Sequence, residues 1–230
     1  MMKTLTRALI TAGAFIVFSA PLLADTPAER LHDSAVLLKE IMNAPDQGIP
    51  QDLLEKANCV VIVPGVKKAA FLVGAKYGKG FLVCRNENNR GWGAPASIRM
   101  EGGSFGFQIG ASDTDLVMLV MEPSGKESLL QSQFTLGGSA GVAAGPVGRS
   151  TTAQTDAQMR AKILSYSRSR GVFAGIALNG ATLRQDLDEN KELYGKPLTN
   201  REIIDGNTKS PDAASQLISS LNKFSRREQG

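Results

Sequence analysis

Residues 59–85 read CVVIVPGVKKAAFLVGAKYGKGFLVCR, a series of apolar runs interrupted by glycine, proline and lysine. Short apolar runs rich in Val, Ile and Phe between such breaks are typical of β-strands. We predict strands over residues 59–63, 69–76 and 80–85, with turns at the Gly and Pro positions between them. The stretch is therefore expected to form an antiparallel meander.

Three more strands are predicted downstream, with further ones between residues 159 and 183. The run 116–121 is apolar throughout, which is typical of a strand buried on both faces. In the run 104–111 bulky and small residues alternate, so one face is predicted to be bulky and the other open to close approach by backbone or ligand. The bulky positions are Phe105, Phe107 and Ile109, and the three strands cover residues 96–100, 104–111 and 116–121.

Helices are predicted on both sides of the strands. Thr26-Pro27-Ala28-Glu29 is a capping box with proline at the first helical position, and it predicts a helix that runs to about Asn43. A second capping box lies at residues 199–202, and the last predicted helix, from Ser210, carries an apolar stripe. The stripe consists of Leu217, Ile218, Leu221 and Phe224, and shorter helices are predicted after Pro50 and over residues 125–132.

This order of elements, with helices first, then many short strands, then helices again, favours an α+β fold. Glycines inside several of the predicted strands are typical of bends in a sheet. We therefore predict a curved, mostly antiparallel sheet or a partly closed barrel, flanked by N- and C-terminal helices.

The first 24 residues have the layout of a cleavable secretory signal. Lys3 and Arg7 precede an apolar run over residues 8–20, and Leu22-Leu23-Ala24 follows before Asp25. A membrane anchor is the alternative, but the run is shorter than the about 20 apolar residues that span a bilayer, and Pro21 is one of several interruptions. We predict cleavage after Ala24, export to the periplasm if the source is Gram-negative, and a single domain over residues 25–230.

Cys59 and Cys84 are the only two cysteines. An even pair in an exported chain points to a disulfide, and each cysteine lies at the outer end of a predicted strand. The register of the strands is not fixed by the sequence, so two buried free thiols remain the alternative.

Several segments resemble the SYLF-domain family. In the family pattern an apolar strand ends in Pro-Gly and is followed by Val-Lys-Lys, a second strand, Tyr-Gly-x-Gly and a third strand that ends in Cys-Arg. Residues 59–85 match this pattern, and the resemblance extends over about residues 30–226. Further matching segments are GWGAP at 91–95, GFQIG at 106–110, AGPVGR at 144–149 and the stretch 163–195.

The resemblance implies a phospholipid-binding domain. In eukaryotic relatives the domain is associated with phosphoinositides and, in yeast, with actin regulation. Neither partner is expected outside a bacterial inner membrane, so the resemblance is not taken to imply actin binding here.

The basic residues cluster in the segments that resemble the family. Residues 56–86 contain six lysines and arginines and no acidic residue, and residues 149–170 contain five basic residues against Asp156 alone. Lysines near an anionic membrane contribute roughly 1 kcal/mol each, which favours salt-sensitive attachment. A solvated charged face without a ligand is the alternative. The predicted headgroup contacts are Lys67, Lys68, Arg149, Arg168 and Arg170.

Catalytic chemistry is poorly supported by the sequence. His32 is the only histidine and lies in a predicted helix, and no Gly-x-Ser-x-Gly motif is present. Every second residue from Asp186 to Glu192 is acidic or an amide, as at the start of a calcium loop, but Lys191 and Pro197 occupy positions that exclude an EF-hand. A solvated helix N-terminus is predicted here, with a small irregular Ca²⁺ site as the alternative. We predict no catalytic residue, metal, cofactor or nucleic-acid partner.

The sequence thus predicts an exported, non-enzymatic phospholipid-binding protein, peripheral to a membrane, whose basic residues contact anionic headgroups beside an apolar, glycine-rich surface. The alternative is a structural or stress protein of the cell envelope that acts by docking to another protein. In that case the C-terminal stripe is a candidate docking face, although such a stripe more commonly packs into the core.

Overall fold

The computed structural model describes residues 25–44, 48–71, 73–86, 91–105, 110–137, 141–148, 161–169, 171–176, 178 and 180–225. The predicted signal segment lies outside the described residues. So do Arg149 and Arg170 among the predicted headgroup contacts, and Phe107 and Ile109 of the predicted bulky face.

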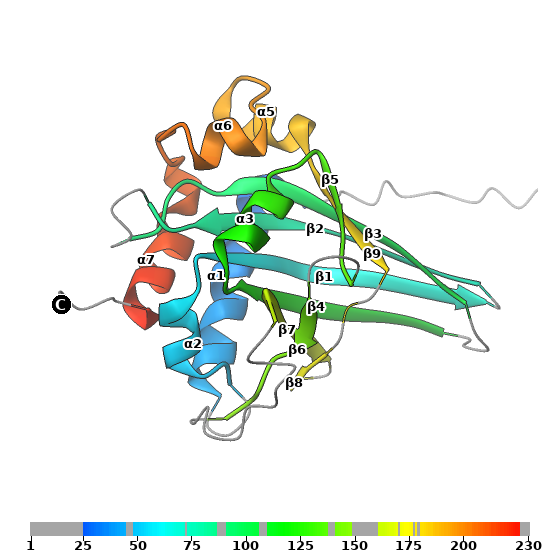
Figure 1. Cartoon of the computed structure of the whole chain (residues 1–230). Coiled ribbons are helices and arrows are strands. Elements are labelled where there is room, and N and C mark those ends of the chain that lie inside the picture. The colour runs from blue at the N-terminus through cyan, green and yellow to red at the C-terminus, as the bar shows by residue number, and fades with distance from the viewer. Residues whose placement is uncertain are drawn as a thin grey trace, which may run out of the picture.

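One nine-stranded sheet forms the centre of the described structure (Figure 1). Neighbouring strands are antiparallel, except that β6 runs parallel to β7. This arrangement, a strongly curled sheet flanked by N- and C-terminal helices, confirms the predicted fold class. The order in the sheet is β5 (Gln133–Thr135), β9 (Ala181–Gln185), β3 (Ala96–Phe105), β2 (Val73–Cys84), β1 (Cys59–Phe71), β4 (Gly110–Val120), β7 (Ile163–Ser169) and β6 (Val142–Ala144), with β8 (Val172–Gly175) also pairing with β7.

The helices gather toward one end of the sheet, and the far ends of β1 to β4 project away from them (Figure 1). The helix α1 (Pro27–Asn43) begins at the predicted Thr26 capping box, and α6 (Asn200–Ile204) begins at the second one. Helices α1 and α7 (Ser215–Phe224) pack against each other. The remaining helical elements are α2 (Gln51–Lys56), α3 (Pro123–Leu129), α5 (Leu187–Tyr194) and the 3₁₀ turn η1 (Asp212–Ala214).

The sheet has buried side chains on both faces. We call the face that packs against α1, α2 and α7 the helix face, and it includes Val60 and Ile62. The opposite, inner face includes Val61 and Val63 and is enclosed by the curl of the sheet. Residues 116–120 are at most 3% exposed, which confirms the predicted burial on both faces for all of the run 116–121 except Met121, which is partly buried. This double burial explains why the central strands are continuous apolar runs.

The C-terminal stripe is part of the core. Leu217 and Leu221 are fully buried, and Ile218 and Phe224 pack against the same cluster. Amphipathic helices bury their apolar stripe in this way in most globular proteins. The alternative use of this stripe as an exposed docking face is therefore wrong.

The predicted turns of the central hairpin were wrong. β1 continues through Pro64 and Gly65, where the register to both neighbouring strands shifts by a β-bulge, and the chain reverses between Phe71 and Val73. A bulge accommodates proline, which has no N–H to donate, and a glycine with φ of 60°. The predicted strand 69–76 thus spans the real turn, and the predicted strand 104–111 is divided between the ends of β3 and β4.

Two glycines are required by close packing. A Cβ at Gly80 would overlap the backbone of Ile62 on the neighbouring strand, and a Cβ at Gly145 would overlap the ring of Tyr166. Tyr166 is fully buried in the helix-face core. Glycine at position 145 therefore lets a large aromatic ring lie directly on the backbone.

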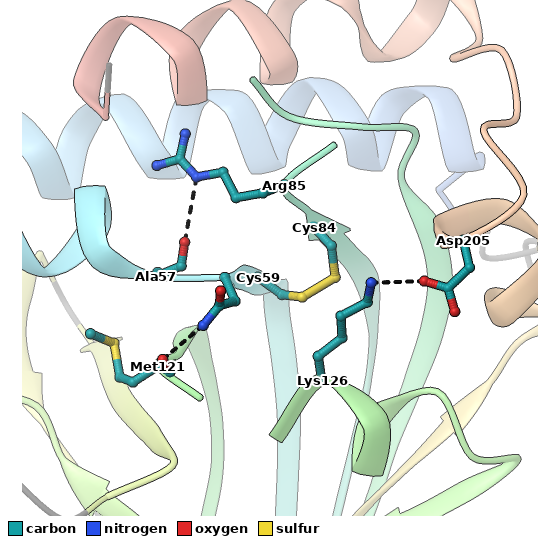
Figure 2. The surroundings of a disulfide bond; sticks show 8 residues. Ala57, Cys59, Cys84, Arg85, Met121, Lys126 and Asp205 are labelled. Carbon is teal, nitrogen blue, oxygen red and sulfur yellow. Dashed lines mark hydrogen bonds and ion pairs between the residues drawn. A yellow bond between two sulfur atoms is a disulfide. The ribbon is translucent and has the colours of Figure 1, made fainter. Parts of the chain in front are cut away.

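Cys59 and Cys84 are directly opposite each other in the β1–β2 register and form a disulfide (Figure 2). Both residues are buried, at 0% and 2% exposure. The neighbouring Arg85 stacks on Trp92 and donates hydrogen bonds to carbonyl oxygens of Ala57 and Ser225. The disulfide joins β1 to β2, and Arg85 ties this hairpin to the C-terminal ends of α2 and α7.

Candidate functional site

An open cleft of about 870 Å³ lies where the start of α1 and the start of α5 meet the helix face of β1, β2 and β4. The bulge of β1 forms part of its wall, because Pro64 and Gly65 line it. The cleft therefore joins elements that are far apart in the sequence. Its charged lining residues are Asp25, Arg30, Asp33, Lys67, Lys79, Asp113, Asp188, Glu189 and Glu192.

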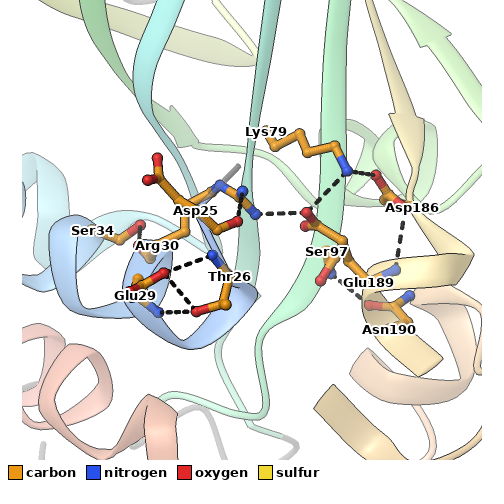
Figure 3. A network of polar contacts seen from close by, with 10 residues as sticks. All are labelled: Asp25, Thr26, Glu29, Arg30, Ser34, Lys79, Ser97, Asp186, Glu189 and Asn190. Atoms are coloured by element: carbon orange, nitrogen blue, oxygen red, sulfur yellow. Dashed lines mark hydrogen bonds and ion pairs between the residues drawn. The ribbon is translucent and has the colours of Figure 1, made fainter. Parts of the chain in front are cut away.

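A buried ionic network holds one side of the cleft together (Figure 3). Glu189 Oε1 accepts hydrogen bonds from Arg30 Nη1 at 2.6 Å and from Lys79 Nζ at 3.0 Å. Lys79 Nζ also lies 3.1 Å from Asp186 Oδ2, and Asp186 caps the N-terminus of α5. Two cations and two carboxylates thus connect α1, β2 and α5.

The Lys79 ammonium stays charged in this network. Burial by itself lowers the pKa of Lys79, but the hydrogen bonds and charges of Glu189 and Asp186 outweigh burial and raise the pKa above its ordinary value. Lys79 and Arg30 are therefore balanced by internal carboxylates, and they add little net charge to the cleft.

The rest of the charged lining is mainly acidic. Asp33, Asp113, Asp188 and Glu192 are exposed, and none of them forms an ion pair within the described part of the chain. The pKa of the nearby Asp115 is raised above its ordinary value, mainly by burial. The hydrogen bond from the N–H of Gly65 opposes this rise, whereas the charges of Asp113 and Asp33 add to it. The cleft consequently has a negative electrostatic character.

The two predicted lysines of the Val-Lys-Lys motif lie on opposite faces of β1. Lys67 is exposed, lines the cleft and pairs in register with Asp113 and Tyr77. Lys68 is half-buried on the inner face and pairs in register with Lys76. Side chains alternate along a strand, so adjacent lysines cannot share one surface.

Arg168 lies on β7, on the helix face. Its Nε donates to Asp115 Oδ2 at 2.6 Å, its Nη1 pairs with Glu40 of α1, and its guanidinium lies over the ring of Phe173. Burial lowers the pKa of Arg168. These contacts tie β4, β7 and α1 together, and they match the charge of Arg168 with the carboxylates of Asp115 and Glu40.

No local pattern in the sequence indicates the cleft. Lys79 belongs to the basic stretch 56–86, yet its partners Glu189 and Asp186 lie more than a hundred residues later. The helix-cap role of Asp186 was the one locally readable clue, because acidic residues are favoured at a helix N-terminus. Side chains alternate along β1 and β4, but this alternation places Lys67 beside Asp113 only in the observed register, which local sequence does not specify.

The described residues offer neither a metal-binding cluster nor a membrane-spanning helix. No cluster of three or more His, Cys, Asp or Glu side chains in these residues has the arrangement to hold a metal ion. Among the described helices, none has both the length and the apolar character needed to cross a bilayer.

Comparison with known proteins identifies the family. Residues 101–224, more than half of the chain, match the Ysc84 family model, described as "Las17-binding protein actin regulator". The chain is 34% identical over 186 residues to SH3 domain-containing YSC84-like protein 1 of Homo sapiens, covering 80% of this chain and 54% of the human protein. The chain belongs to the Ysc84 family. This confirms the SYLF resemblance.

Yeast members of the Ysc84 family match at the same level. Protein YSC84 of Saccharomyces cerevisiae is 34% identical over 176 residues, which cover 75% of this chain and 37% of the yeast protein. LAS seventeen-binding protein 3 from the same species is also 34% identical over 176 residues and 75% of this chain, with 38% of that protein covered. The Ysc84 family description is that of a binding and regulatory protein. The chain spans about half or less of these relatives, so their shared region is the domain and not the whole protein.

Proposed function

We propose that this protein is an exported, non-enzymatic phospholipid-binding protein that attaches to anionic membrane surfaces. The SYLF resemblance supports a phospholipid ligand. The observation that carries the proposal is the composition of the far ends of β1 to β4, which project away from the helices (Figure 1).

The far strand ends carry no charged residue among the described positions. Outward from the Lys68–Lys76 pair, the register places only small, apolar or hydroxyl-bearing residues opposite one another. An uncharged end next to lysines is suited to a membrane surface, where apolar groups enter the interface and ammonium groups meet phosphates. The described positions are residues 69–71, 73–75, 103–105 and 110–111.

The lysines next to this end supply the electrostatic part of the attachment. Lys67 and Lys68 lie on opposite faces of β1, and Lys76 on β2 pairs in register with Lys68. At roughly 1 kcal/mol each near an anionic surface, two lysines change the binding constant by about 30-fold. Such attachment weakens as salt is added, because exposed charges are screened over about a Debye length.

The test is sedimentation of residues 25–230 with phosphatidylglycerol vesicles and with phosphatidylcholine vesicles, each at low and high salt. We expect binding that requires the anionic lipid and weakens with salt. The double variant Lys67→Glu/Lys68→Glu should bind anionic vesicles at least about 30-fold more weakly.

Lys191→Glu/Lys196→Glu is the matched control, because it makes the same change in net charge at exposed positions near α5. Equal weakening by both double variants would assign the effect to net charge and overturn the lysine assignment. No binding to any vesicle would overturn the membrane-surface function.

A second candidate function is docking to a protein partner. It is favoured by the family description and by the relatives named for binding Las17. We do not extend the actin or Las17 role to this chain, because the comparisons cover only part of those relatives. Pull-down experiments would compare the proteins captured by immobilised residues 25–230 with those captured by a variant whose cleft carboxylates are replaced. Proteins captured only by the unmodified chain would be specific partners.

A further inference from the structure

We propose that the acidic cleft binds a lysine- or arginine-containing segment of a partner protein. This inference rests on the second candidate function, and of the lysines proposed for membrane attachment only Lys67 also lines the cleft. Three features of the cleft support the proposal: its negative charge, an exposed aromatic side chain and a buried hydrogen-bond acceptor.

The charge of the cleft selects a cation. Arg30 and Lys79 are matched by Glu189 and Asp186, which leaves Lys67 as the remaining basic side chain of the described lining. Against it stand Asp25, Asp33, Asp113, Asp188 and Glu192. A phosphate would be repelled by this set, whereas an ammonium or guanidinium group would be attracted by it.

An aromatic ring adds a second feature suited to a cation. Tyr77 lines the cleft and is 47% exposed, which is unusual for a large aromatic side chain. Cations bind over the face of an exposed aromatic ring with a modest gain, and neighbouring carboxylates strengthen the attraction. Tyr77 pairs in register with Lys67 on one side and Glu101 on the other, so it lies within the charged part of the sheet.

The buried wall of the cleft also retains an unsatisfied acceptor. Glu189 lines the cleft and is only 5% exposed. Its Oε1 accepts from both Arg30 and Lys79, but its Oε2 is buried and has no hydrogen-bond partner in the described structure. Buried carboxylate oxygens are normally hydrogen-bonded, so this oxygen can accept from an entering donor once the Glu189 side chain turns toward the cleft.

The shape favours a chain segment over a single ion. The cleft is open, and its wall is contributed by α1, β1, β2, β4 and α5. The unpaired carboxylates are spread over three of these elements, α1, β4 and α5, and do not converge to a metal-binding cluster among the described residues. An extended segment with several basic side chains can meet such separated carboxylates at the same time.

The experiment measures binding of a fluorescein-labelled peptide of alternating lysine and alanine to residues 25–230 by fluorescence anisotropy. The same peptide with glutamate in place of lysine is the negative probe. In the cleft variant Asp113→Asn/Asp188→Asn/Glu192→Gln, affinity for the lysine peptide should fall by about tenfold. Tyr77→Leu should weaken binding by about threefold.

The matched control is Glu122→Gln/Glu127→Gln/Asp212→Asn, which removes the same charge from exposed positions outside the cleft. It should bind the lysine peptide within about twofold of the unmodified protein. Thermal unfolding of each variant establishes that it is folded. Amide chemical-shift changes on peptide addition should centre on residues 77, 113 and 188.

Three outcomes would overturn the inference: equal weakening by the cleft and control variants, equal binding of the glutamate peptide, or shift changes that lie away from the cleft. Competition by spermidine at concentrations below those of the peptide would overturn the choice of a protein segment in favour of a small polyamine. Vesicle sedimentation of the cleft variant should not weaken, so a negative result here leaves the proposed membrane function untouched.

Discussion

Removal of the Cys59–Cys84 disulfide is expected to lower the free energy of unfolding by about 3.5 kcal/mol. The two cysteines are separated by 25 positions in the sequence. In the chain-entropy model, a cross-link closing a loop of this length removes about 12 cal/mol/K from the entropy of the unfolded chain, or about 3.5 kcal/mol at room temperature.

The native state should change little when the bond is broken. Cys59 and Cys84 are paired in the β1–β2 register, so the strand hydrogen bonds already hold them together. Both are buried in an apolar cluster, where reduced cysteine is well tolerated. The effect should therefore arise mainly in the unfolded state.

Equilibrium urea unfolding, followed by circular dichroism, measures the difference. Three samples are compared: the oxidised protein, the same protein unfolded and refolded in reductant, and Cys59→Ala/Cys84→Ala. The reduced protein keeps both sulfur atoms, so it isolates the cross-link, whereas the double variant also loses buried side-chain volume. We expect the reduced protein to lose about 3.5 kcal/mol, and the double variant somewhat more.

The urea dependence gives a second readout. Without the cross-link the unfolded chain is more extended, so the m-value should stay the same or rise. A reduced protein whose unfolding free energy lies within about 1 kcal/mol of the oxidised protein would refute the loop-entropy reasoning.

Three further perturbations test the packing and the charges. Gly145→Ala should destabilise the fold by about 1–3 kcal/mol, because the new methyl group meets a buried tyrosine ring, whereas Gly103→Ala, which has room for a Cβ, should be tolerated in the same urea assay. Lys79→Met should cost about 1–2 kcal/mol in thermal or urea unfolding, less than for a fully buried pair, because Lys79 is 30% exposed and Glu189 keeps its other cation. Hydrogen bonds to the backbone and side chain at the helix cap lower the pKa of Glu29, so its stabilising effect is present above about pH 4.5 and is lost as the pH falls through the lower, folded-state pKa. The stability difference between the unmodified protein and Glu29→Gln should thus shrink on acidification, and an NMR titration that finds the Glu29 pKa at or above 4.5 would contradict this.

The helices could be predicted because local residues specify their ends. The capping box at Thr26 and Glu29 and the one at Thr199 and Glu202 form as the sequence indicated. The strand boundaries were harder to predict, because glycine and proline are compatible with both a turn and a bulge. Pro64 and Gly65 form a bulge, since the neighbouring strands supply hydrogen-bonding partners on both sides of it.

The candidate site depended on contacts that no local pattern specifies. The alternation of side chains along β1 predicts that Lys67 and Lys68 point to opposite faces, but which face meets α5 depends on strand order and register. The pairing of Lys79 with Glu189 joins a strand to a helix 110 residues later. Local sequence therefore identified the charged residues without showing which of them neutralise one another.

The bulge at Gly65 also determines where the charges of the hairpin lie. A shift of one residue moves every later side chain of a strand to the opposite face. With the bulge, Val66 is buried on the inner face and Lys67 turns toward the cleft beside Asp113, while Lys68 lies on the inner face with Lys76. Asp113 offsets part of the charge of Lys67, whereas Lys68 lies opposite another cation in the register, Lys76. The bulge thus puts Lys67 and Lys68 on opposite faces of β1, and it keeps the acidic cleft on the face of Lys67, where it is free to bind a cation.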